Sequence, residues 1–153
     1  MNLPANIEAP TQLILSNYRR LLGRDLAGIA EGPAAAEQLF AAPCALLSAL
    51  GPLGSDHNFN YANRTALELF EYSWDELMGK PSSASAEPVH RDERRKLLDE
   101  VGRRGFIEDY SGIRISKNGR RFRIKRATVF NLLDDEGHYV GQAATFADWE
   151  PVT

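Results

Sequence analysis

An Asn-Gly pair in the last third of this 153-residue chain constrains the fold more than any other sequence feature. Asn118-Gly119 is the dipeptide most typical of a two-residue β-hairpin turn, because both residues accept a left-handed backbone. Three stretches rich in strand-forming residues follow one another around it: 106–116, 121–132 and 139–149. Since tight turns join them, these stretches predict a three-stranded antiparallel meander.

The first two thirds of the chain alternate between short helical and strand-like segments. Thr11 is a suitable N-cap for an amphipathic helix that ends at Gly23. Asn63 follows a strand-like stretch, and we expect its side chain to cap the next helix and tie it to that strand. Ser73 and Glu76 form a capping box at the start of another helix. The remaining predicted segments are helices at 34–40 and 91–104 and strands at 44–50 and 59–61.

This order of elements predicts an α+β fold with a five-stranded antiparallel sheet, short helices on one face and an N-terminal flanking helix. We expect residues 1–38 to form an arm and the flanking helix, and residues 39–153 to form the main domain. A hydrophobic content of 43% supplies one core without help from disulfides or a metal.

The segment at 59–70 resembles the second strand and first helix of a PAS domain, and 72–79 is similar to the stretch that follows them. More narrowly, the chain resembles the MEKHLA family, whose PAS-like domains occur alone in bacteria and at the C-terminus of plant homeodomain–leucine-zipper factors. The segments that carry this resemblance are 17–24, 60–70, 86–88, 110–114 and 141–146. The resemblance implies a sensory or regulatory role.

Composition argues against several classes of protein. A net charge of −3 does not suit general binding to a nucleic-acid backbone. The single cysteine excludes an internal disulfide and fits a reducing compartment, so we expect a cytoplasmic protein. We recognise no secretory signal at the N-terminus and no apolar stretch long enough to cross a membrane.

We expect no cofactor and no metal site. The helix that begins at Asn63 lacks the cysteine with which light-sensing PAS domains attach flavin, and Cys44 lies in an apolar run where it is expected to pack as a small hydrophobe. The three histidines, which fall in predicted turns or at a helix start and show no metal-binding spacing, are His57, His90 and His138.

Strand alternation along 121–132 raises the question of a ligand site. Arg121, Arg123 and Lys125 fall on one face, which is either a solvated face or a patch for an anionic ligand or partner. Arg126 and Thr128 fall on the opposite, apolar face, unless a β-bulge reverses the alternation. A cation buried there needs a partner, either an internal carboxylate or the acid group of a ligand. The predicted ligand-binding residues are Tyr61, Tyr110, Arg126, Thr128 and Gln142.

We interpret the chain as a stand-alone sensory or regulatory module that binds a small molecule or a protein partner and does not catalyse a reaction. The rival interpretation is a small isomerase or hydrolase with Asp109, Tyr110 or Arg126 in an internal cavity. Titratable groups that converge in a pocket would favour the enzyme, and an apolar pocket the sensor.

The apolar stripe of the N-terminal helix needs a covering surface, which either the chain's own sheet or a second copy can provide. We predict a homodimer through this helix, because a symmetric dimer is the commonest oligomer. Output would pass to another protein.

Overall fold

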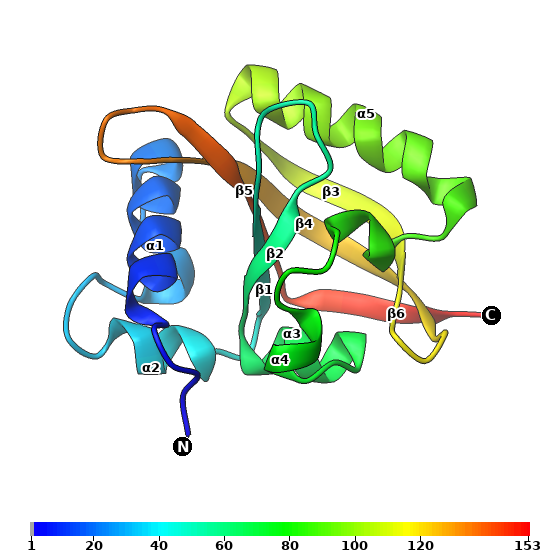
Figure 1. Cartoon of the computed structure of the whole chain (residues 1–153), viewed down its shortest axis with the longest axis horizontal. Helices are drawn as coiled ribbons and strands as arrows, with labels where there is room; N and C mark the ends of the chain where they lie inside the picture. Colours follow the sequence, from blue (N-terminus) through cyan, green and yellow to red (C-terminus); the bar gives the residue numbers. More distant parts are fainter. Residues whose placement is uncertain (1) are drawn as a thin grey trace.

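The computed structural model describes residues 2–153 and contains one antiparallel sheet with helices on both faces (Figure 1). The strand order is β2-β1-β5-β4-β3, and a sixth strand, β6, also pairs with β4. The strands are β1 (Ala45–Leu50), β2 (Asn58–Ala62), β3 (Phe106–Ile115), β4 (Arg121–Leu133), β5 (Tyr139–Phe146) and β6 (Asp148–Val152). The predicted α+β fold and antiparallel sheet are confirmed.

The last strand differs from the expectation of one stretch at 139–149. It breaks after Phe146, and β6 then pairs with the first half of β4, at Arg121–Lys125. The second half of β4 pairs with β5. The two halves of β4 meet at a β-bulge, so the strand changes partner where its backbone bends.

The helices divide between the two faces of the sheet (Figure 1). On one face lie α1 (Glu8–Leu22) and α2 (Ala35–Phe40), which are joined through the short 3-10 turn η1 (Leu26–Gly28). On the other face lie α3 (Arg64–Phe70), α4 (Trp74–Leu77), the 3-10 turn η2 (Ser82–Ser85) and α5 (Pro88–Arg104). Among residues 2–153, no helix is long and apolar enough to cross a membrane.

Helix α1 begins one turn earlier than predicted and ends at Gly23 as predicted. Thr11 is not its N-cap; the Thr11 hydroxyl instead donates to the Ile7 carbonyl oxygen at 2.8 Å, within the first turn. The apolar stripe of α1 packs on its own sheet, where the Tyr18 and Phe130 rings meet edge to face at 5.4 Å between centroids. The stripe that motivated a dimer is therefore covered within the chain.

Asn63 caps α3, as predicted, but it ties this helix to β1 rather than to β2, the strand that it follows. Its Oδ1 accepts from the Ala66 amide at 3.1 Å, which caps α3, and from the Leu46 amide at 3.0 Å. Its Nδ2 donates to the Cys44 carbonyl oxygen at 2.8 Å and to that of Leu39 at 3.2 Å. Asn63 is fully buried, and this one side chain hydrogen-bonds four backbone groups.

The β-bulge in β4 overturns the expected phase of the strand. Arg126 has a left-handed backbone with φ of 52°, and beyond it the alternation is reversed. Val129 consequently faces α5, while Phe130 and Leu132 face α1. The bulge that the sequence left open is present, so Arg126 does not point into the helices: its guanidinium is exposed and forms an ion pair with Asp148.

Candidate ligand-binding cavity

A cavity of about 90 Å³ lies between the sheet and the layer formed by η2 and α5. Its apolar wall includes Phe59, Phe70, Ile124, Val129 and Phe146, which come from β2, α3, β4 and β5. Its polar side chains are Ser48, His57, Ser82, Ser85, Arg94, Arg114 and Gln142. The cavity is thus mainly apolar, with polar groups that converge on it from separate elements, as is usual for small-molecule sites.

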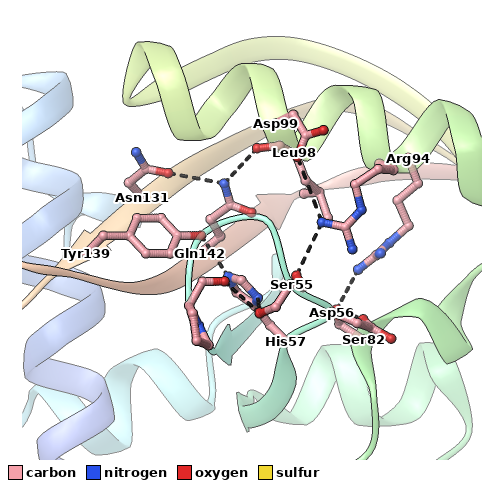
Figure 2. A network of polar contacts seen from close by, with 12 residues as sticks. Ser55, Asp56, His57, Ser82, Arg94, Leu98, Asp99, Asn131, Tyr139 and Gln142 are labelled. Atoms are coloured by element: carbon pink, nitrogen blue, oxygen red, sulfur yellow. Dashed lines mark hydrogen bonds and ion pairs between the residues drawn. The ribbon is translucent and has the colours of Figure 1, made fainter.

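Arg94 enters the cavity from α5 and is only 7% exposed. Its Nη2 donates to the Ser82 hydroxyl at 2.7 Å, and that hydroxyl donates to Asp56 at 3.3 Å (Figure 2). Burial lowers the pKa of Arg94 to about 10, with a further contribution from the positive charge of Arg114. The guanidinium still carries its charge at neutral pH, so the cavity contains a buried cation.

Arg114 enters the same cavity from β3 and is also 7% exposed. Its guanidinium lies over the Tyr110 ring at 5.6 Å from the ring centroid and donates to the Tyr110 hydroxyl at 3.2 Å. That hydroxyl in turn donates to Glu93 on α5 at 3.1 Å. Tyr110 therefore lies between the buried cation and an exposed carboxylate.

Gly112 makes the pairing of Tyr110 and Arg114 possible. These three residues alternate along one face of β3, and a Cβ atom at position 112 would lie 3.1 Å from Arg114 Nη1 and would collide with the Tyr110 hydroxyl. The absence of a side chain at Gly112 leaves the space that the two larger side chains occupy.

Gln142 holds the other half of α5 against the sheet. Its Nε2 donates to the Leu98 carbonyl oxygen at 3.0 Å and to Asn131 Oδ1 at 3.2 Å (Figure 2). Asn131 Nδ2 donates onward to the Gly102 carbonyl oxygen at 3.2 Å. This small network fixes the distance between α5 and the strands that line the cavity.

His57 closes the side of the cavity nearest the β1–β2 loop. Its Nε2 lies 2.7 Å from the Tyr139 hydroxyl, and burial lowers the pKa of His57 (Figure 2). Arg95, next to Arg94 on α5, donates to the Ser55 carbonyl oxygen at 3.2 Å. The loop that carries His57 is therefore fastened to α5.

Of the five predicted ligand-binding residues, the structure places Gln142 in the cavity wall and Tyr110 directly behind Arg114. Tyr61 packs in the cluster on the α1 face, because Asn60 is an extra residue in the β1–β2 pairing and turns Tyr61 away. Thr128 shares the α1 face with Phe130, and Arg126 lies at the surface. The five residues do not form one site.

Sequence reasoning missed Arg94 and Arg114, the two cations of the cavity. A signal for Arg94 was present, since it falls at helical spacing with the buried stripe of Leu97, Leu98 and Val101. An arginine on the buried side of a helix predicts either an internal ion pair or a ligand. The rival enzyme's Asp109 is exposed, and Cys44 packs against the cluster on the α1 face rather than lining the cavity.

The MEKHLA domain model matches residues 8–151. No curated protein matches the chain. Among solved structures, the PAS domain of a protein from Colwellia psychrerythraea is similar at a TM-score of 0.64 and 14% identity, covering 77% of this chain and 93% of that one. The photo-excited blue-light photoreceptor Vivid is similar at a TM-score of 0.59 and 18% identity, covering 88% and 94%.

The light-state dimer of the fungal photoreceptor Vivid is similar at a TM-score of 0.60 and 19% identity, over 97% of this chain and 99% of that one. At such identities these likenesses establish the fold, while the family model covers both the flanking helix and the sheet. The chain therefore belongs to the MEKHLA domain family and has a PAS fold.

Proposed function

We propose that this chain is a sensory module that binds a small molecule in the cavity between the sheet and α5, and that it catalyses no reaction. The observation that carries the proposal is the convergence of Arg94, Arg114 and Gln142 on one apolar-walled cavity from three different elements. Buried polar side chains directed into an apolar cavity are the usual means of orienting a ligand.

The chemistry of the lining favours binding over catalysis. Within the described residues, the cavity wall contains no carboxylate and no thiol, and the ring of His57 already contacts the Tyr139 hydroxyl. A general base needs a free acceptor within reach of its substrate. This lining offers hydrogen-bond donors rather than a base, which suits recognition of a ligand.

Output is proposed to pass through the sheet to α1, whose tyrosine ring rests on β4. A ligand that prefers one arrangement of the sheet shifts the population of the corresponding arrangement of α1. The outer side of α1 is polar, with Arg19 and Arg20 exposed, and we propose it as the contact for a protein partner or a second copy of the chain.

We retain as a proposal the division into an N-terminal arm with the flanking helix (1–38) and a main domain (39–153). We also propose a cytoplasmic location, which the single cysteine supports.

A cavity-filling substitution tests the binding function. Ala144 lines the cavity, and Ala144→Leu would fill part of it, whereas Ala147→Leu adds the same carbons at an exposed position between β5 and β6. We expect native mass spectrometry of freshly purified protein to detect a small molecule that denaturation releases. It should be lost from Ala144→Leu and retained by Ala147→Leu. An adduct that survives in a folded Ala144→Leu protein would contradict the proposed site.

A further inference from the structure

We propose that the ligand of this cavity is a small organic acid whose carboxylate is held between the guanidinium groups of Arg94 and Arg114. The inference rests on the proposed binding function and adds the chemical class of the ligand. It starts from these two arginines, which line the same cavity and are each only 7% exposed to solvent.

Neither arginine has an ion-pair partner within residues 2–153. A buried cation normally has such a partner, because removing a cation from water is costly unless a counter-charge replaces the hydration. Two guanidinium groups that approach each other without an anion add mutual repulsion to that cost. An anion in the cavity would remove both penalties.

Each arginine does reach a carboxylate indirectly, through one hydroxyl. Arg94 reaches Asp56 through Ser82, and Arg114 reaches Glu93 through Tyr110. Asp56 and Glu93 are both exposed, so solvent screens their charges. These relays orient the guanidinium groups but leave the interior of the cavity positive.

Both guanidinium groups retain donors for a ligand. Arg94 donates one hydrogen bond to the protein, and Arg114 donates two, one to Tyr110 and one to its neighbour Ile113. Most of the N–H groups of each fork remain available, and the planar fork matches the two oxygens of a carboxylate. Lysine would offer only a point charge at the same place.

The rest of the cavity sets the size and polarity of the acid. The space is about 90 Å³, and its apolar walls include the aromatic and aliphatic side chains of Phe59, Ile124 and Phe146. A short apolar body with one acidic group fits this lining. Inorganic phosphate would satisfy the charge but would leave the apolar wall without a partner.

The experiment compares acids with their own amides. Acetate, butyrate and benzoate, each beside its primary amide, and inorganic phosphate are titrated into the full chain by calorimetry or by ligand-observed NMR. We expect at least one acid to bind, and we expect its amide to bind at least about tenfold more weakly. Loss of one charge-assisted hydrogen-bond pair has about that effect. Equal binding of acid and amide would overturn the proposal, as would binding of phosphate alone or of none of these probes.

Three substitutions of one kind locate the anion. Arg94→Gln and Arg114→Gln should each weaken binding of the acid about tenfold or more, while Arg126→Gln, at an exposed ion pair, should leave it unchanged. If either glutamine variant fails to fold, Arg94→Lys and Arg114→Lys retain the charge without the fork and should still weaken binding. Unchanged affinity in folded variants of both arginines overturns the anion proposal. A native mass adduct that Ala144→Leu abolishes would then still support the binding function on its own.

Discussion

The Asn17 side chain on α1 hydrogen-bonds both backbone polar groups of Leu133 at the end of β4. The Leu133 amide donates to Asn17 Oδ1 at 3.0 Å, and Asn17 Nδ2 donates to the Leu133 carbonyl oxygen at 3.0 Å. The side-chain amide thus pairs with β4 as a neighbouring strand would. This contact fixes the position of α1 along the strand whose other face lines the cavity.

Replacing Asn17 should loosen α1 from the sheet. Asn17→Ala leaves both Leu133 groups without their partner in a mostly buried place, so we expect a loss of about 1–3 kcal/mol in the free energy of unfolding. Ser16→Ala is the matched control on the same helix turn, because the Ser16 hydroxyl bonds only within α1. Urea unfolding measures both, and equal stabilities of the two variants would refute the role given to Asn17.

Asn63 should cost more to remove than an ordinary helix cap. An exposed cap is worth about 1 kcal/mol, and Ser73→Ala in the capping box of α4 should show that value. Asn63→Ala removes four hydrogen bonds to the backbone and leaves the buried Leu46 and Ala66 amides without this acceptor, so we expect a loss of at least about 2 kcal/mol in the same urea measurement. Similar losses for the two alanine variants would show that burial adds nothing at Asn63.

Gly112 is predicted to control the position of Arg114. Gly112→Ala places a methyl group against Arg114 Nη1 and the Tyr110 hydroxyl, so one of these side chains must move. The expected cost is about 1–3 kcal/mol, typical of overpacking, and the side-chain NMR signals of Arg114 should shift. Ser111→Ala, at the exposed neighbouring position, should change neither quantity. An unchanged Arg114 signal in Gly112→Ala would contradict the packing described for this strand.

The buried His57 should make the fold less stable in mild acid. Burial lowers its pKa below the ordinary value of 6.5, so the unfolded chain takes up a proton at a pH where the folded chain does not. Stability should therefore fall as pH decreases through about 6.5 towards the lowered pKa of the folded state. In His57→Gln this part of the pH dependence should disappear, and in His138→Gln, at an exposed position, it should persist. Urea unfolding at pH 7.5 and 5.5 would detect the difference.

Local signals predicted the elements of this fold because the atoms that decide them are close in sequence. The Asn118-Gly119 turn, the Asn63 cap and the Ser73 capping box each act within a few residues. These features, with the alternation of short helices and strands, were enough to predict the antiparallel sheet and the PAS-like order.

The candidate site was harder to predict, because its composition depends on two β-bulges. The extra residues at Arg126 and Asn60 reverse the alternation, which removes Arg126, Thr128 and Tyr61 from the cavity. An arginine with a left-handed backbone carries no signal in the sequence that distinguishes it from one in a regular strand. Arg114 did carry a signal, because it alternates on β3 with Tyr110, which was predicted to bind the ligand, and the bulge of β3 lies before Tyr110.

Val129 lines the cavity and its neighbour Phe130 packs against α1, so the cavity face and the α1 face of the sheet are one peptide bond apart. A chain of side chains is not needed to carry a signal from ligand to helix; a rotation of the β4 backbone at this point moves both surfaces together. The sensitivity of such a device depends on the stiffness of one strand. Substitutions that change how easily β4 twists would therefore alter the response without altering either the ligand contacts or the surface of α1.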